Sequence, residues 1–183
     1  KLAAMGAYIV DLVDTGDASS DGDLQDGAPV RKILLFAHHQ NLLNALEEKL
    51  KSEGFGYIRI DGKTPPSSRH ALCTQFQTDR KVRVAVLSIT AASVGLTLTA
   101  ASLVVFCELF FNPGILVQAE DRAHRIGQTD SVTVHYLLAK GSIDDRLWPL
   151  LLSKLNTLET VGLGSNDFTG MTQIEHDDRQ LRI

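Results

Sequence analysis

The chain has 183 residues, which is the size of one domain with a single hydrophobic core. Hydrophobic residues make up 44% and charged residues 22%, and no apolar run approaches the roughly 20 residues that span a bilayer, so we expect a soluble protein. The two cysteines, Cys73 and Cys107, form no CxxC pair, which argues against a disulfide framework or a zinc site. We expect both to be buried packing residues in a reducing compartment.

The net charge of −4 is unevenly distributed. Residues 11–28 contain six Asp and no Lys or Arg, and removing these six acids leaves +2 for the rest of the chain. Phosphates are bound by a local basic surface, so the net charge does not exclude a nucleic-acid partner. We expect residues 14–29 to form a flexible acidic insertion and residues 161–183 to form an irregular tail.

The first segment, residues 1–13, is predicted to be a leading helix with one apolar face. Its stripe comprises Leu2, Met5, Ile9 and Leu12 or Val13. The chain begins with Lys1 instead of an initiator Met, and no signal-peptide pattern follows, so we expect it to be a piece of a longer protein.

From residue 30 to residue 160, short apolar runs alternate with amphipathic segments. Strands are predicted at 32–37, 57–60, 83–88, 102–107 and 131–138. Helices are predicted at 41–54 with Gly54 at the end, at 67–78, from an N-cap at Asn112 through residue 128, and at 142–162 with a bend at Pro149. The order predicts an α/β domain of three layers, with a mainly parallel central sheet.

Ligands of such sheets bind at the carboxyl ends of the strands, which directs attention to the loops that follow. In the loop after the second strand, Thr64, Ser67 and Ser68 carry hydroxyls close to a helix N-terminus, where a phosphate could bind. The alternative is that Ser67 is an ordinary N-cap and that Arg69 packs on a neighbouring carboxylate.

The loop after the third strand, residues 88–102, is small and rich in hydroxyls. Ser88, Thr90 and Thr97 could approach a sugar-phosphate strand together with main-chain amides, and Gly95 would permit a close backbone approach. The alternative is a small-residue helix that packs tightly on the sheet. Composition does not decide between the two.

The segment "QAEDRAHRIGQ", residues 118–128, carries two arginines on a predicted helix. Gln118, Arg122 and Arg125 are spaced i, i+4 and i+7 and therefore share one face. Arginine binds multi-oxygen anions such as phosphates through forked hydrogen bonds. The alternative is a solvated surface helix with salt bridges.

The histidines and the single tryptophan are not expected to bind a metal ion. His38, His39 and His124 lack metal-ligand spacing, because adjacent residues at the end of a strand are expected to point apart. No metal site is predicted. Trp148 is expected to anchor the last helix to the core, with base stacking as the weaker alternative.

Taken in order, these loops resemble the motifs of the second RecA-like lobe of superfamily-two helicases, and specifically of the Swi/Snf-related double-stranded DNA translocases. "KILLFAHH" resembles motif IV, "YIRIDGKTPPSSR" the segment after it, "VLSITAASVGLTLTAAS" motif V and "QAEDRAHRIGQ" motif VI. The match runs from about Lys32 to Leu155, and "HRIGQ" is close to a family signature. "FAHH", "ELFFNPG" and "DDRLWPL" are most similar to the SMARCAL-type, HARP-like annealing helicases that remodel forks.

The resemblance implies a role for individual residues. Arg125 would be the arginine finger, with Arg122 as its companion at the γ-phosphate of ATP, while Gln118 and Gly95 would couple nucleotide state to movement. The residues expected to face the DNA backbone are His38, Thr64, Ser88 and Thr90. Thr97 stands where many relatives carry Asn.

The chain contains neither a GxxxxGK[ST] loop nor a paired acidic magnesium motif. The resemblance therefore implies a P-loop NTPase fold whose second lobe lacks the P-loop. ATP with Mg²⁺ would be bound mainly by an N-terminal RecA-like lobe of the same protein, and this lobe alone would not hydrolyse ATP. The expected partners are that lobe and double-stranded or forked DNA in the nucleus, with no membrane.

Three alternatives share some of these features. A chromatin-remodelling ATPase lobe and an RNA helicase lobe have the same fold, although "HRIGQ" argues against the RNA helicase. A non-catalytic interaction module is the third, and the two arginines of motif VI weigh against it. A Rossmann enzyme is excluded because no GxGxxG follows the first strand.

Overall fold

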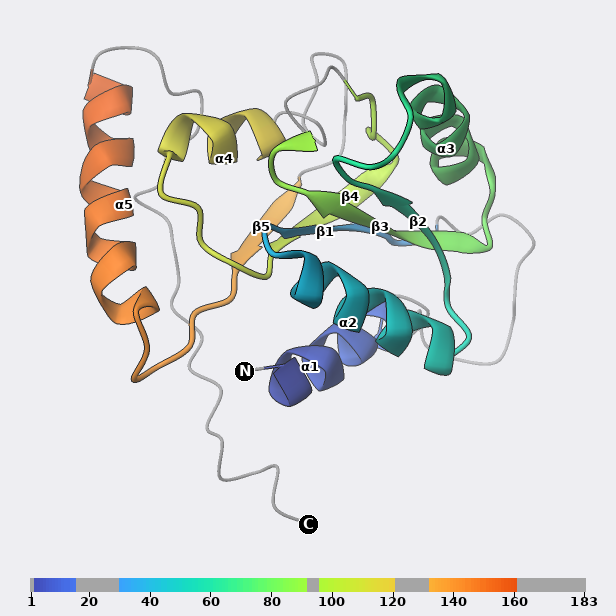
Figure 1. Ribbon diagram of the computed structural model, residues 1–183, viewed down its shortest axis with the longest axis horizontal. Helices are drawn as coiled ribbons and strands as arrows, with labels where there is room; N and C mark the ends of the chain where they lie inside the picture. The colour runs from blue at the N-terminus through green and yellow to red at the C-terminus, as the bar shows by residue number, and fades with distance from the viewer. Residues whose placement is uncertain (1, 16–29, 92–95, 121–131, 161–183) are drawn as a thin grey trace.

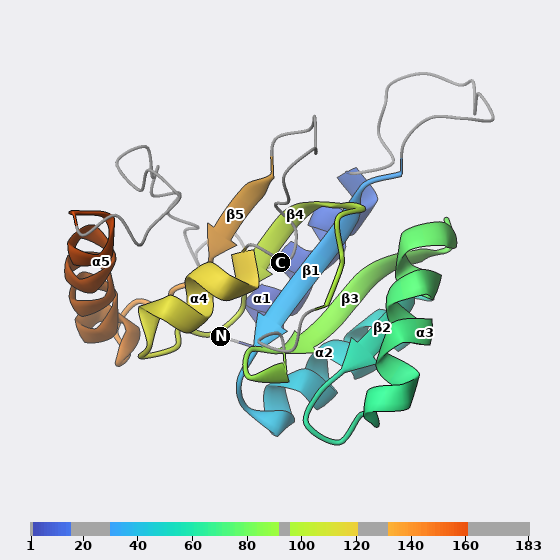
Figure 2. The ribbon, with the colours of Figure 1, turned by 90° about the horizontal axis from the view of Figure 1, so that it is seen from above.

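A computed structural model describes residues 2–15, 30–91, 96–120 and 132–160. Five strands form one sheet in the order β2-β3-β1-β4-β5, and every neighbouring pair is parallel (Figure 2). The strands are β1 (Lys32–Ala37), β2 (Gly56–Ile60), β3 (Val82–Ser88), β4 (Ala101–Phe106) and β5 (Thr133–Tyr136). The predicted parallel sheet is confirmed, although β5 is shorter than the predicted strand 131–138.

Helices cover both faces of this sheet (Figure 1). They are α1 (Leu2–Asp14), α2 (Gln40–Ser52), α3 (Pro66–Thr78), α4 (Pro113–Glu120) and α5 (Asp144–Thr160). The first two lie on one face, while α3 and α4 lie on the other with α5 beside α4. The three-layer α/β prediction is therefore confirmed. The predicted acidic insertion lies outside the described residues from 16 to 29, as does the tail from 161 to 183.

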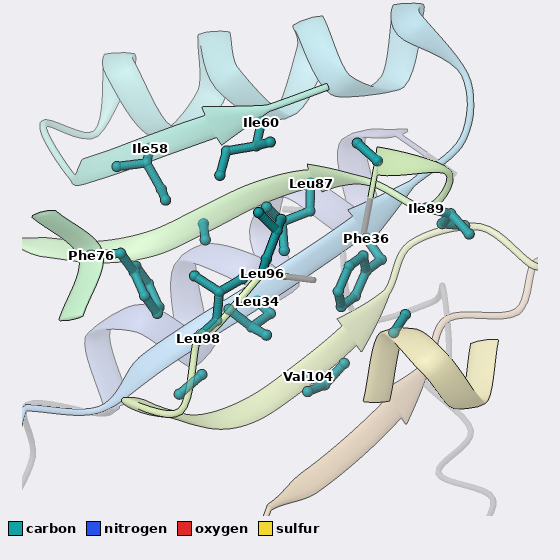
Figure 3. Close-up of a cluster of buried hydrophobic side chains, with 14 of the residues drawn as sticks. Leu34, Phe36, Ile58, Ile60, Phe76, Leu87, Ile89, Leu96, Leu98 and Val104 are labelled. Carbon is teal, nitrogen blue, oxygen red and sulfur yellow. The ribbon is translucent and has the colours of Figure 1, made fainter. Parts of the chain in front are cut away.

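The central strand β1 is buried along its whole length, which explains its continuous apolar sequence. Successive side chains of a strand point to opposite faces. Ile33 and Leu35 accordingly join the core beneath α1 and α2, whereas Leu34 and Phe36 join the core beneath α3 and α4 (Figure 3). The helix α1 is part of the first core, because Met5, Ile9, Leu12 and Val13 are all buried there.

A row of aromatic rings crosses the second face from the centre of the sheet to α5. Phe36 stacks on Phe106 with ring centroids 5.2 Å apart, and Phe106 stacks on Tyr136 at 4.7 Å. Tyr136 then contacts Trp148 at 5.1 Å. The prediction that Trp148 anchors the last helix is confirmed, and the helix continues past Pro149.

Local signals at helix ends were partly correct. Gly54 has a φ of 75° directly after the cap of α2, a conformation that glycine adopts without strain. The Asn112 Oδ1 accepts a hydrogen bond of 3.1 Å from the Gly114 N–H, as expected of an N-cap. The alternative that Ser67 caps α3 is wrong, because Pro65 occupies the cap position without a side-chain cap bond. Pro66 can begin the helix because its missing N–H needs no partner there.

Both cysteines are buried, as predicted. Within the described ranges, no helix combines the length and the apolar composition needed to cross a membrane.

We predict that Phe36→Ala lowers the free energy of unfolding by about 3 to 5 kcal/mol, because it removes a fully buried ring and leaves a cavity between Phe106 and the helices above it. Urea denaturation measures the change. The matched control is Phe111→Ala, in which the ring is 60% exposed. A loss as large at Phe111 as at Phe36 would contradict the assignment of Phe36 to the core.

Candidate functional site

The loops after β1, β3 and β4 meet at the carboxyl edge of the sheet. Beyond the last paired residues, the Ile89 N–H donates to the Ala37 carbonyl at 3.0 Å and the Cys107 N–H donates to the Phe36 carbonyl at 2.8 Å. The β2 loop follows on the far side of β3. Of the residues predicted to face DNA, His38, Thr64 and Thr90 therefore lie in loops that follow adjacent strands, and Ser88 is the last residue of β3.

The loop after β2 is folded tightly around Asp61, whose side chain is buried. Its Oδ1 accepts from the Lys63 N–H at 2.8 Å. The Asp61 N–H donates to the Thr64 Oγ1 at 3.0 Å, and the Thr64 N–H donates to the Asp61 carbonyl at 3.1 Å. Because the Thr64 oxygen accepts this backbone bond, its own hydroxyl proton can be donated to an outside acceptor such as a phosphate oxygen.

Arg69 closes the same loop from α3. Its Nε donates to the Thr64 carbonyl at 3.1 Å, and its Nη2 approaches the Asp61 carbonyl at 3.4 Å. The expected alternative that Arg69 packs on a carboxylate is therefore wrong, because the nearby carbonyls of the turn accept instead. Ser67 and Ser68 are exposed on the first turn of α3.

Arg59 of β2 joins this loop to α2, a role that was not predicted from the sequence. Its guanidinium donates to the Asp61 Oδ2 at 2.9 and 3.1 Å and to the Glu47 Oε2 at 2.6 Å. The Oδ1 of Asn44 and the Oε1 of Gln40 accept at 2.8 and 3.0 Å. The available signal was the i, i+2 spacing of Arg59 and Asp61, which puts both on one face of a strand.

The ionisable groups of this network titrate away from their ordinary values. The pKa of Glu47 falls from 4.5 to about 2, chiefly through its hydrogen bond with Lys51. Burial raises this pKa, but the hydrogen bonds from Tyr57 and Arg59 lower it as well, so the net change is downward. Burial raises the pKa of Asp61, but the Lys63 N–H and the Arg59 guanidinium outweigh it, so the net change is downward. Both carboxylates therefore remain ionised and hold the loop from β2.

At the end of β3, Ser88 and the nearby loop residue Thr90 are positioned differently. Ser88 is only 3% exposed, and its Oγ accepts from the Ala91 N–H at 3.1 Å and lies 3.2 Å from the Thr90 Oγ1. Thr90 is exposed. Ser88 thus shapes the turn, while Thr90 presents a hydroxyl to the surface. The described residues 96–98 have no regular secondary structure, with Leu96 and Leu98 in the core, so these three do not form the alternative helix. Gly95 lies outside the described residues.

The loop after β1 carries two exposed histidines that contact one another. The rings of His38 and His39 lie 5.1 Å apart at 76°, so the expectation that they point apart is wrong. Both backbone N–H groups turn toward Glu108, whose Oε2 accepts from His38 at 2.6 Å and from His39 at 2.9 Å. The strand β1 ends at Ala37 and α2 begins at Gln40, so the two histidines lie in a bend between them, where the alternation of a strand no longer holds.

Glu108 completes this contact with its second oxygen. The Oε1 lies 2.8 Å from the His39 Nδ1. Partial burial raises the pKa of Glu108. The hydrogen bonds from the His39 and His38 backbone and from the His39 ring together outweigh burial, so the net shift of this pKa is downward. The carboxylate is therefore an ionised acceptor between β1 and β4.

Of the predicted nucleotide-facing residues, the structure describes Gln118, which is exposed on α4. Arg122 and Arg125 lie outside the described residues, and their common helical face stays a prediction. Across the parts of the chain that are described, no group of three His, Cys, Asp or Glu side chains could hold a metal ion.

Comparison with known families gives the context for this edge. Residues 22–127 match the model of the helicase conserved C-terminal domain. The chain belongs to this family. A solved structure of the C-terminal part of the Fun30 ATPase domain has the same fold, with a TM-score of 0.69 and 29% identity over 81% of this chain and 44% of that one. The predicted second RecA-like lobe of a helicase is thereby confirmed.

Curated relatives place the chain close to the Swi/Snf-related annealing helicases. It is 60% identical over 141 residues to a SWI/SNF-related matrix-associated actin-dependent regulator of chromatin subfamily A-like protein 1 homolog of Caenorhabditis elegans, covering 77% of this chain and 20% of the relative. It is 48% identical over 149 residues to the DNA annealing helicase and endonuclease ZRANB3 of Mus musculus, covering 81% of this chain and 14% of the relative. The chain thus spans a fifth or less of the length of these proteins.

We predict that Glu47 stabilises the helicase lobe in a pH-dependent manner. Because its folded pKa of about 2 lies below the ordinary 4.5, this stabilisation is complete above pH 4.5 and is lost as the pH falls toward 2. The difference in free energy of unfolding between the wild type and Glu47→Gln should therefore narrow over that range. Urea denaturation across the range measures it.

The control for this experiment is Glu48→Gln, since Glu48 is an exposed acid on the same helix. It removes an equal charge without touching Arg59. We expect a smaller change in the free energy of unfolding than at Glu47. A difference between the wild type and Glu47→Gln that stays constant across the range would contradict the network.

Proposed function

We propose that the chain is the second motor lobe of an ATP-dependent double-stranded DNA translocase that anneals or remodels forked DNA. The observation that carries the proposal is the gathering of Thr64, Thr90 and His38 in loops after adjacent parallel strands. The carboxyl edge of such a sheet is where α/β domains bind ligands. Hydroxyls and turn amides at this edge suit the sugar-phosphate backbone, which is contacted without reading the bases.

In this proposal, the ATP site forms between two lobes. The chain carries neither the phosphate loop nor the acidic motif that holds Mg²⁺, so both would come from an N-terminal RecA-like lobe of the same protein. Arg125, with Arg122 beside it, would donate to the γ-phosphate and neutralise charge that develops in the transition state. Gln118 and Gly95 would link the nucleotide to closure of the cleft.

Movement along DNA would follow from this closure. When ATP draws the two lobes together, the backbone grip of this lobe shifts relative to the grip of the other, as in hinge-type domain motions. The two strands need not separate, because the contacts are to phosphates. A nuclear role in repair or at replication forks fits the likeness to ZRANB3, a DNA annealing helicase and endonuclease.

A second candidate is a chromatin-remodelling motor. The name of the Caenorhabditis elegans relative contains "regulator of chromatin", and this likeness favours a nucleosome as the substrate of this second candidate. Forked DNA and mononucleosomes of equal DNA length, compared as activators of ATP hydrolysis, distinguish the candidates. Stronger activation by the fork supports the annealing helicase.

We predict that this chain, joined to its N-terminal lobe, hydrolyses ATP when forked duplex DNA is present, and that Arg125→Lys lowers this rate by roughly 10³-fold or more. Lysine keeps the charge but lacks the forked donor geometry. DNA affinity should be largely unchanged, because the arginine faces the nucleotide. Coupled-enzyme ATPase assays and fluorescence anisotropy measure the two quantities.

The matched control is Arg146→Lys at an exposed position of α5. We expect neither its ATPase rate nor its DNA affinity to change appreciably. Hydrolysis by the wild-type chain without the other lobe would reveal an unrecognised phosphate site. Equal losses of hydrolysis and DNA affinity in Arg125→Lys would rule out the arginine-finger role.

We further predict that Thr64→Val weakens DNA binding by roughly tenfold, because a hydrogen bond to a charged phosphate is lost. Thr64→Ser keeps the hydroxyl that bonds to the Asp61 N–H and should retain most of the affinity. Anisotropy titrations at fixed salt measure both variants, since phosphate binding depends strongly on salt. Serine as weak as valine would show that the hydroxyl is not the contact.

A further inference from the structure

Glu108 lies in the segment that joins β4 to α4, and among the described residues its side chain bonds to the loop after β1. Three donors converge on one carboxylate: the N–H groups of His38 and His39 at 2.6 and 2.9 Å, and the His39 Nδ1 at 2.8 Å. Hydrogen bonds to an ionised acceptor are stronger than neutral ones. The two loops are therefore held together by one side chain.

A second contact runs parallel to this one. The ring of Phe110 lies 5.0 Å from the ring of His38, so the β4–α4 segment touches the β1 loop at two points. Two residues further on, Asn112 caps α4 through the Gly114 N–H. The segment 108–112 is thus bonded to the β1 loop at one end and sets the first turn of α4 at the other.

The carboxylate also determines what the β1 loop can offer to DNA. Glu108 accepts from the N–H groups of His38 and His39, the two residues directly before α2, where an outside anion would otherwise be favoured. Those amides are already engaged and cannot also bind a phosphate. The groups that the loop still presents are side chains, foremost the exposed ring of His38. Glu108 is therefore suited to positioning and not to binding.

We propose that Glu108 is a positioning residue that couples DNA contact at the His38–His39 loop to the placement of α4, the helix that carries Gln118. The inference rests on the proposed function, because it assigns a route between the DNA edge and the nucleotide-facing helix of the same motor. A displacement of the β1 loop by DNA is passed to residues 108–112 through a charged contact, and from there to the cap of α4. Two sites coupled in this way change one another's behaviour reciprocally.

The test is the ratio of DNA-stimulated to basal ATPase rate in the complete two-lobe protein, compared for the wild type, Glu108→Gln and Glu108→Ala. Glutamine can still accept from the two backbone N–H groups but loses the charge, so it keeps the loop while weakening the contact. We expect the ratio to fall at least fivefold in Glu108→Gln, the lower end of typical coupling between sites, and further in Glu108→Ala. Thermal unfolding confirms that each variant is folded.

Two further variants sharpen the test. Glu48→Gln makes the same substitution at an exposed position of α2 and should leave the ratio unchanged. In His39→Ala, the ring contact to Oε1 is already absent. If Glu108 acts through this contact, Glu108→Gln should lower the ratio less when it is introduced into His39→Ala than when it is introduced into the wild-type protein.

The outcomes are separable. A folded Glu108→Gln protein whose ratio stays within twofold of the wild type overturns the coupling role, while the proposed function stands. The coupling role is also overturned if the basal rate, the stimulated rate and the DNA affinity all fall by the same factor. That pattern indicates a general structural defect. A wild-type protein that DNA does not stimulate overturns the proposed function and the coupling role together.

Discussion

The burial of a parallel sheet on both faces is the constraint on which the rest of the structure depends. β1 is covered by α1 and α2 on one side and by the α3 and α4 layer on the other, and all six of its residues are buried. A strand in this environment must satisfy its backbone groups through its neighbours, which fixes β3 and β4 beside it in parallel. Parallel strands end at the same edge, so the loops of the candidate site meet there without any contact having to draw them together.

Charged groups at that edge serve mainly to shape loops. Arg59 links α2 to the Asp61 turn, and Glu108 links the β1 loop to the segment before α4. Each bridges two elements that are distant in the sequence, and each pairs an ionised side chain with several donors or acceptors. Such groups are strongly held because leaving one of them partly buried without partners costs more than an ordinary hydrogen bond. The surface that faces outward is consequently composed of hydroxyls, imidazoles and turn amides, which suit a phosphate backbone.

The sequence-based prediction succeeded where a local rule was sufficient. The strand at 32–37 was predicted at its observed limits from an unbroken apolar run, and the ends at Gly54 and Asn112 followed from the conformations that these residues favour. It failed where a distant partner decided the outcome. His38 and His39 turned toward Glu108, which is about 70 residues further along the chain. The cap of α3 is a local miss, because Pro65 occupies that position in place of Ser67. Strand alternation and capping preference contain no information about a carboxylate on another strand.

By itself, the sequence determined the alternation of strands and helices, the motifs in their order and the membership of the helicase C-terminal family. These properties depend on periodicity and on short residue patterns, which are local. Only the tertiary structure decided that Ser88 is turned inward while Thr90 is exposed, and that Arg59 and Glu108 hold the loops on either side of them. The physical reason is that burial and hydrogen-bond partnership are set by which strands become neighbours, and the order β2-β3-β1-β4-β5 differs from the order in the chain.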